Sequence, residues 1–216
     1  MLFSTIPRHL VHNFMGPFHV LLEMLKCMGS LFDLVLLPLL MTYRGMSEGR
    51  VFWVMFPSDP GAAFAEYRLI ILAVYSAAVP AATAAKKAKG DASPLLAHEL
   101  TESMFNRAKE CPAAAAILMW LVFAETSLAI LDSKDVFGQY GDFPGYLSLL
   151  RVAELLFGMV NAYKYVRLVS ETLHYFCTCC PAVYMIYWIW GFTMKAGKGG
   201  RYFVDQFGKL HAQAAL

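Results

Sequence analysis

The sequence predicts an all-α, multi-pass helical membrane protein with about four transmembrane helices and further amphipathic helices at the membrane surface. Of its 216 residues, 58% are hydrophobic and 16% are charged, and the mean hydropathy is +0.50. Soluble domains are roughly 45–50% apolar and about 25% charged. The apolar excess collects in long uncharged runs, and a bilayer crossing needs roughly 20 such residues. Little remains for a separate soluble core, so residues 1–216 are expected to form a single integral-membrane domain.

Three runs are the cleanest candidates for crossing helices. Residues 69–85 carry no charge, residues 111–131 carry only Glu125, and residues 172–194 carry no formal charge. Each run is close to the length that the hydrocarbon core requires, and flanking Lys and Arg side chains can reach the headgroups. We therefore expect a transmembrane helix at each of the three.

The first expected span, residues 17–41, is less uniform. It begins at Pro17, a residue that suits the first position of a helix because the missing N–H would be unpaired there anyway. Glu23, Lys26 and Asp33 lie within it at spacings of three and seven, which places them on one helical face. A helix surrounded by lipid would not carry this stripe, so we expect the stripe to face protein, water or headgroups.

Residues 146–171 repeat this pattern with more charges. A single crossing is costly here, because each mid-membrane charge costs about 2.5–3.5 kcal/mol even on lenient scales. We expect an amphipathic helix that lies along the membrane surface or packs against protein, and a fifth crossing is the alternative. The tail, residues 195–216, is expected to form a short interfacial helix. The charges that form the stripe of residues 146–171 are Arg151, Glu154, Lys164, Arg167 and Glu171.

Glu125 is the main candidate for chemistry inside the membrane. A carboxylate in an apolar span is unfavourable unless it is protonated, hydrogen-bonded or paired. Two interpretations follow: a polar contact between helices, or a proton relay or ion ligand. No metal or cofactor site is expected, although phospholipids such as cardiolipin can bind where Lys and Arg meet headgroups.

Five cysteines form an odd, unevenly spaced set, which argues against a disulfide framework. Three of them, Cys177, Cys179 and Cys180, form a cluster. Zinc sites use paired cysteines with a second pair elsewhere, and no second pair exists here. The remaining interpretations are small buried hydrophobic residues or acylated cysteines near a membrane boundary.

One local resemblance involves residues 153–174, AELLFGMVNAYKYVRLVSETLH, which cover 22 of the 216 residues. This segment resembles the last helix of subunit a, the proton-channel subunit of rotary ATP synthases. That family has an essential Arg on the preceding helix, followed four residues later by Asn, whereas Arg107 here is followed by Cys111 and Arg151 by Leu155. The family's chain also ends at this helix, so no site residue is carried over. The matching positions are Glu154, Met159, Asn161, Ala162, Tyr163, Leu168, Val169, Ser170, Leu173 and His174.

The function expected from these features is that of a non-catalytic accessory subunit in a large energy-transducing complex of the mitochondrial inner membrane, either the respiratory chain or ATP synthase. The expected partners are other subunits and membrane lipids, because the polar stripes need protein neighbours. A net charge of +2 does not create the strong positive electrostatic field that attracts nucleic acid. The sequence contains no phosphate-binding loop, hydrolase triad or metalloprotease motif. The alternatives are a proton-conducting subunit and a small stand-alone transporter.

Overall fold

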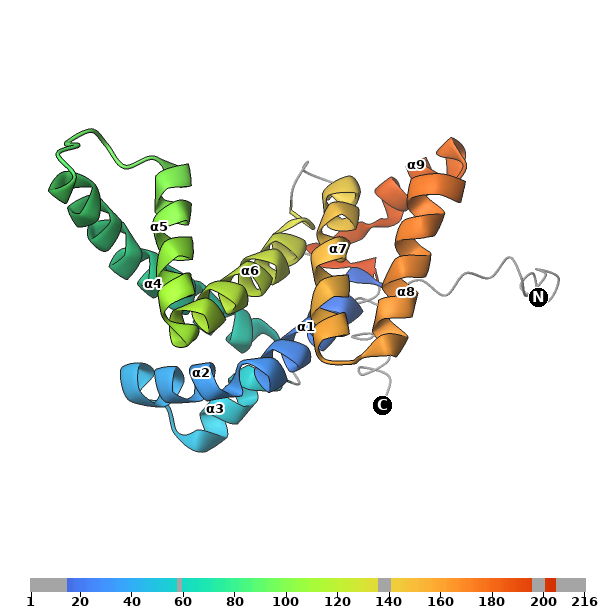
Figure 1. Cartoon of the computed structure of the whole chain (residues 1–216). Helices are drawn as coiled ribbons and strands as arrows, with labels where there is room; N and C mark the ends of the chain where they lie inside the picture. The colour runs from blue at the N-terminus through green and yellow to red at the C-terminus, as the bar shows by residue number, and fades with distance from the viewer. Residues whose placement is uncertain (1–14, 58–59, 136–140, 196–200, 205–216) are drawn as a thin grey trace, which may run out of the picture. The chain divides into compact units, whose positions relative to one another are not determined.

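A computed structural model describes residues 15–57, 60–135, 141–195 and 201–204 (Figure 1). The described chain is mostly helical, which confirms the all-α class. Contacts divide it into two compact units, one within Met1–Leu21 and Ala129–Leu216 and the other within Leu22–Leu128. Two helices, α1 (Pro17–Leu31) and α6 (Pro112–Asp132), each contain a boundary between the units.

The expected first span, residues 17–41, is not one continuous helix. The helix α1 ends at Leu31, and Phe32 leaves helical geometry with φ −116° and ψ 20°. The Asp33 carboxylate then accepts the Leu34 N–H at 2.7 Å, and a new helix begins at that point. The elements that follow are α2 (Asp33–Pro38), a π-helical turn η3 (Leu39–Tyr43) and α3 (Glu48–Met55).

Among the described residues, two helices are long and apolar enough to cross a membrane: α4 (Pro60–Ala88) and α6. The helix α4 contains the expected span 69–85, and α6 contains residues 112–131 of the expected span 111–131. Only 11% of the most apolar window of α4 is buried, against 39% for α6. A core helix of a soluble domain would be buried along its apolar face, so the exposed surface of α4 favours a lipid or protein neighbour. Four crossings are not confirmed.

The core of the unit 22–128 is built from α1, α3, α4 and α6. The rings of Tyr67 and Trp120 meet edge to face at 5.3 Å and join α4 to α6. In α1, Gly29 lies so close to the Met55 backbone that a side chain there would strike the carbonyl of α3. The polar helix α5 (Ala97–Glu110) forms a hairpin with α4 and buries none of its residues.

The other unit contains a helical hairpin where the sequence predicts one amphipathic helix over 146–171. The helix α7 (Phe143–Met159) ends before a turn at Asn161, and α8 (Tyr163–His174) then runs back along it. Asn161 has φ 58°, a left-handed conformation that Asn tolerates better than most residues, and Tyr163 donates a hydrogen bond to its side chain at 2.8 Å.

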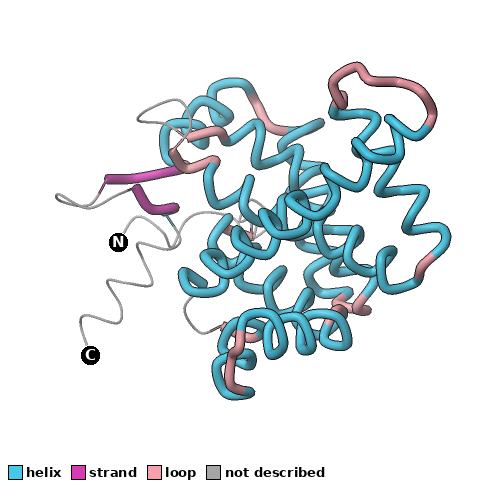
Figure 2. Tube along the Cα trace, turned by 90° about the vertical axis from the view of Figure 1, so that its left-hand side faces the viewer, coloured by secondary structure: helices cyan, strands magenta, loops and turns pink. Residues whose placement is uncertain are grey.

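The expected span 172–194 is also divided. After α8 comes a π-helical turn η4 (Tyr175–Cys179), then Pro181, and then α9 (Ala182–Gly191) of ten residues. The strands β1 (Thr193–Lys195) and β2 (Arg201–Phe203) pair antiparallel, with Thr193 opposite Phe203 (Figure 2). Residues 201–203 of the tail are therefore extended where the sequence predicts an interfacial helix, and residues 205–216 lie outside the described chain.

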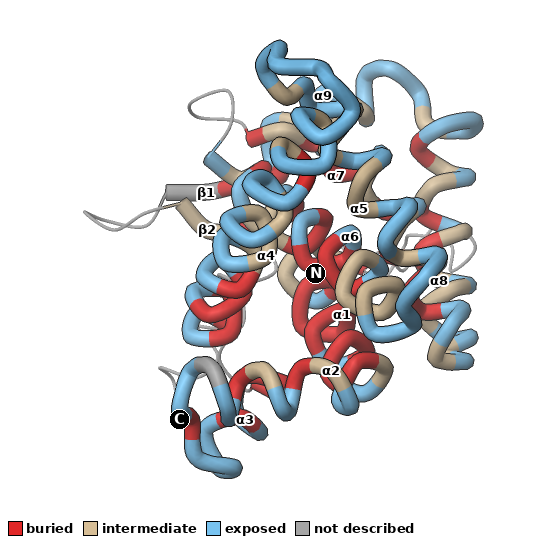
Figure 3. Tube along the Cα trace, turned by 60° about the vertical axis from the view of Figure 1, so that its left-hand side comes forward, coloured by how far each residue is buried: buried red, intermediate tan, exposed pale blue. Residues whose placement is uncertain are grey.

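An aromatic core holds this unit together around Phe143 at the start of α7. The Phe143 ring meets Phe176 edge to face at 5.0 Å, stacks on Trp188 at 6.1 Å, and meets Phe192 at 5.3 Å. Phe203 of β2 extends the cluster through Phe192. Trp188 thus connects α9 to the aromatic core, while most of α9 remains exposed (Figure 3).

Candidate functional site

The first candidate site joins the two apolar helices of the unit 22–128. The Tyr75 hydroxyl on α4 donates a hydrogen bond of 2.7 Å to Oε1 of Glu125 on α6. The Glu125 side chain is exposed on α6 rather than buried. Its neighbours Thr126 and Ser127 do not help to bind it, because their hydroxyls donate to the backbone carbonyls of their own helix.

A single carboxylate with one neutral donor can hold a proton or accept a second hydrogen bond. A proton relay needs a chain of groups, and Tyr75 is the one hydrogen-bond partner of Glu125 within the described chain. The geometry therefore favours the polar-contact interpretation. The Glu125 carboxylate faces outward and can accept a hydrogen bond from a neighbouring molecule.

The expected stripe on residues 17–41 is divided by the break at Phe32. Glu23 is buried, with 9% of the residue exposed, and Lys26 Nζ lies 2.7 Å from its Oε1. Glu23 is therefore satisfied within the chain and is not available to a partner. Lys26 and Asp33 remain exposed, but they lie on two different helices.

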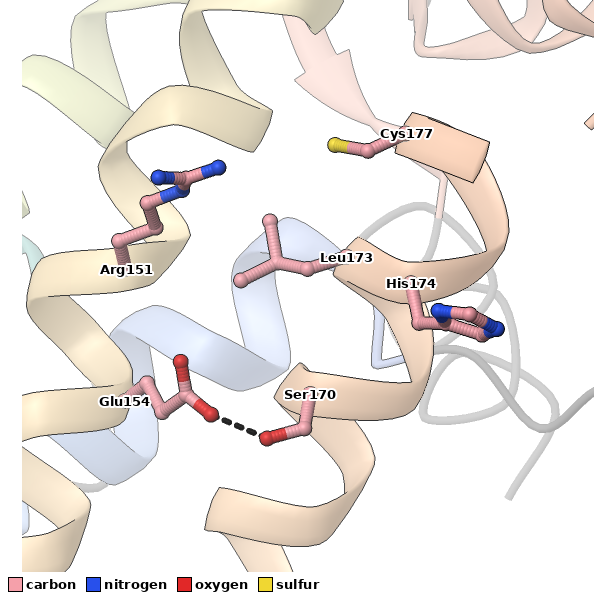
Figure 4. Close-up of a pocket in the computed structure, with 6 residues that line it drawn as sticks. All are labelled: Arg151, Glu154, Ser170, Leu173, His174 and Cys177. Atoms are coloured by element: carbon pink, nitrogen blue, oxygen red, sulfur yellow. Dashed lines mark hydrogen bonds between the residues drawn. The ribbon is translucent and has the colours of Figure 1, made fainter. Parts of the chain in front are cut away.

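The second candidate site is a groove between α7 and α8 with a volume of about 400 Å³ (Figure 4). Arg151 and Glu154 enter it from α7, and Ser170 on α8 donates a hydrogen bond to the Glu154 carboxylate. Leu173 lies between the two helices, whereas the His174 ring points away from α7. Cys177 of η4 completes the lining.

The remaining charges of the 146–171 stripe lie on the exposed side of α8. Arg167 and Glu171 pair at 3.4 Å across one helical turn, and Lys164 lies 5.9 Å from the ring of Tyr165. Exposed pairs of this kind contribute about 0–1 kcal/mol. The stripe therefore separates into a groove-lining part, Arg151 and Glu154, and a solvent- or partner-facing part, Lys164, Arg167 and Glu171.

A buried carboxylate that the sequence analysis did not find lies near the start of α4. Glu66 is 7% exposed and is flanked by Arg44 at 3.1 Å and Arg50 at 3.6 Å. Arg50 and Arg44 lie 16 and 22 positions before Glu66 in the sequence, so no local spacing signals the cluster. Its role is structural, because it ties the start of α4 to the segment around α3.

The loop between α4 and α5 is closed by a second cluster. Lys86 Nζ lies 2.7 Å from both carboxylate oxygens of Glu99 and 3.5 Å from Asp91. The backbone N–H of Leu96 and the side-chain ammonium group of Lys86 hold the pKa of Glu99 below its usual value. The backbone N–H of Ser93 does the same for the pKa of Asp91. Glu99 lies three residues after Leu96, the spacing by which a Glu satisfies the start of a helix, so the sequence did carry this signal.

Within the described residues, no group of three or more His, Cys, Asp or Glu side chains is arranged to hold a metal ion. Comparison with protein families, with curated proteins and with solved structures finds no significant match to this chain. The function is therefore argued from the geometry of the molecule.

Proposed function

We propose that the chain is an integral membrane protein that serves as a non-catalytic accessory subunit of a multi-subunit complex. Two features support the membrane location. The helices α4 and α6 have the length and apolarity of crossing helices, and the apolar surface of α4 is exposed. Exposed apolar surface of this length is unfavourable in water, and it is satisfied by lipid or by apolar helices of a neighbour.

The Tyr75–Glu125 pair is the observation that carries the assignment to a complex. At 1.5 Å per residue, Glu125 lies about 20 Å from the start of α6 and about 10 Å from its end, within the hydrocarbon of a crossing helix. A charged group at that depth costs about 2.5–3.5 kcal/mol or more against lipid. Tyr75 offsets only part of this cost, because the carboxylate has four acceptor positions and the tyrosine fills one. A polar group of a partner helix would supply the rest.

The finer proposal places this complex in the mitochondrial inner membrane, as part of the respiratory chain or of ATP synthase, with phospholipids such as cardiolipin between subunits. Its support is the sequence itself: short connections between the apolar runs, and the polar stripe on residues 146–171. Immunolabelling of fractionated cells tests the location. Recovery of the chain in a membrane other than the mitochondrial inner membrane would contradict this finer proposal and leave the broader one standing.

The assay for assembly is native sizing after gentle solubilisation of the membrane. We expect the chain in a particle several times larger than its own 24.1 kDa. Glu125→Leu should release it as a smaller species, whereas Glu125→Gln, which still accepts hydrogen bonds, should retain the complex. A photo-crosslinker at Val122, an exposed residue one turn before Glu125 on α6, should join the chain to its neighbour.

A free wild-type monomer after gentle solubilisation would contradict the accessory-subunit assignment. The same variants also separate it from the proton-conducting alternative, in which the conduction path uses Glu125, Arg151, Glu154 and Glu171. Glu125→Gln would abolish proton flux under that alternative. Under our proposal the flux of the parent complex is unchanged by Glu125→Gln.

A further inference from the structure

Three free cysteines lie together at the end of α8, in residues 177–180, which we call the cysteine turn. Cys177 and Cys179 are exposed and Cys180 is partly exposed. The turn is a direct continuation of α8 through η4, and its last residue, Cys180, has an extended backbone with ψ 119°. The thiols are therefore presented on the surface at a point where the helix stops.

A histidine and a threonine stand beside one of these thiols. The Nε2 atom of His174 lies 3.6 Å from Sγ of Cys179. The Thr178 hydroxyl lies 3.2 Å from the Nδ1 atom of His174 and 3.5 Å from the same sulfur. The His174 imidazole is thus oriented by Thr178 and can accept the thiol proton of Cys179, and the resulting thiolate is the nucleophilic form of cysteine. Cys177 points instead toward Arg151 across the groove (Figure 4).

The helix that follows the cysteine turn presents a surface suited to the membrane interface. It carries no charged residue, and its Tyr187 and Trp190 side chains are 64% and 61% exposed. Ten residues span about 15 Å, half of the roughly 30 Å hydrocarbon core, so α9 alone cannot cross it. Tyr and Trp are enriched where the headgroups meet the acyl chains. The occupant of this surface that its composition favours is therefore a phospholipid layer. Its other exposed apolar residues are Val183, Tyr184, Ile186 and Trp188.

We infer that Cys179 is an S-acylation site that takes a long-chain fatty acyl group from an acyl thioester such as an acyl-coenzyme A. The Cys179 sulfur forms a bond to the acyl carbonyl carbon, and the bond from that carbon to the donor sulfur breaks. The thiol proton passes to His174 and then to the departing coenzyme A thiolate, so no oxidant or reductant is needed. The new chain enters the lipid beside α9, which adds a second membrane signal to an interfacial helix. The inference rests on the membrane location proposed above.

The test uses the full chain in phosphatidylcholine vesicles incubated with palmitoyl-coenzyme A. Acylated cysteines are counted and located by hydroxylamine-dependent thiol labelling and peptide mass spectrometry. Cys111 is a matched control within the chain, because its thiol is also free and exposed. We expect Cys179 to be acylated at least about tenfold faster than Cys111, since a positioned general base contributes at least this much. His174→Asn should bring the two rates together, Cys179→Ser should remove the fast label, and Cys111→Ser should leave it unchanged.

Equal rates at Cys179 and Cys111 in the wild-type chain would overturn the inference, as would a His174→Asn chain that labels at the wild-type rate. Alkaline extraction of the membranes separates this failure from a failure of the proposed function. A wild-type chain that stays in the membrane pellet but takes no acyl group contradicts the acylation site alone. A chain recovered in the aqueous fraction without detergent contradicts the membrane location, and the inference with it.

Discussion

Two buried tyrosines allow the substitution of Tyr by Phe to be compared where the hydroxyl has no hydrogen-bond partner within the described chain and where it has one. Tyr67 in α4 is fully buried, and neither its hydroxyl nor the indole N–H of Trp120 has a hydrogen-bond partner among the described residues. Tyr146 in α7 is 2% exposed, and its hydroxyl donates to the carbonyl oxygen of Met15 at 3.1 Å. Replacement by Phe removes one oxygen from each site, and we expect the two changes in stability to have opposite signs.

The magnitudes follow from the hydrogen bonds. A buried hydroxyl without a partner costs about 1–3 kcal/mol of desolvation, so Tyr67→Phe should raise the free energy of unfolding by about 1 kcal/mol after some loss of packing. Tyr146→Phe loses a buried hydrogen bond to the Met15 carbonyl, with a net value of about 0.5–1.5 kcal/mol. The two variants should therefore differ by about 2 kcal/mol. At about 2–4 °C per kcal/mol for a chain of this size, the difference in Tm is about 4–8 °C.

Thermal unfolding of the two variants and the wild-type chain in one detergent measures this difference. The Tm order we expect is Tyr67→Phe above wild type, and wild type above Tyr146→Phe. A Tyr67→Phe chain that loses as much stability as Tyr146→Phe would refute the reasoning, because it would show that the Tyr67 hydroxyl is hydrogen-bonded in the folded protein. Circular dichroism of each variant before heating checks that the helix content is unchanged.

Three further predictions concern local structure. The Leu96 N–H and Lys86 lower the pKa of Glu99, so the ionised carboxylate stabilises the start of α5. The start of α5 should therefore be most protected from hydrogen exchange above pH 4.5 and lose protection as the pH falls below that value. The Glu99→Gln variant should show no such pH dependence. Gly29→Ala should lower the Tm despite the better helix propensity of Ala, because the new methyl group strikes the Met55 carbonyl. The expected loss of stability is about 1–3 kcal/mol, and an unchanged Tm would contradict this close approach. Asn161→Gly should preserve stability and Asn161→Ala should lower it by about 1 kcal/mol, because only the latter is strained at φ 58°.

The two apolar helices α4 and α6 were predictable because their signal is carried by composition over about 20 residues. The breaks within other expected helices were not found, because helical periodicity continues across a break of one to three residues. At Phe32 the backbone leaves helical geometry, and the Asp33 carboxylate accepts the Leu34 N–H just after it; charge spacing reveals neither feature. At Asn161 the sequence did contain a signal, since Gly158 and Asn161 are residue types typical of a helix C-terminus.

In the candidate site, too, some residues could be predicted from the local sequence and others depend on tertiary packing. Glu125 was predictable because a carboxylate surrounded by apolar residues is conspicuous in the sequence. Tyr75, its hydrogen-bond donor, lies 50 residues away, and such a pair depends on how α4 packs against α6. The same holds for Glu66 and its two arginines, for which tertiary packing supplies every contact.

The segment 172–194 shows why hydropathy alone does not establish a crossing. Mean hydropathy describes which solvent a segment prefers, but it does not describe whether the helix is continuous. Pro181 lacks a backbone N–H and biases Cys180 toward the extended geometry that it adopts. The helix must therefore restart as α9, and its length of about 15 Å then excludes a crossing by α9 alone. Apolar side chains on a helix too short to cross are best satisfied at the membrane interface, the location that the cysteine turn requires if an acyl chain on Cys179 is to enter lipid.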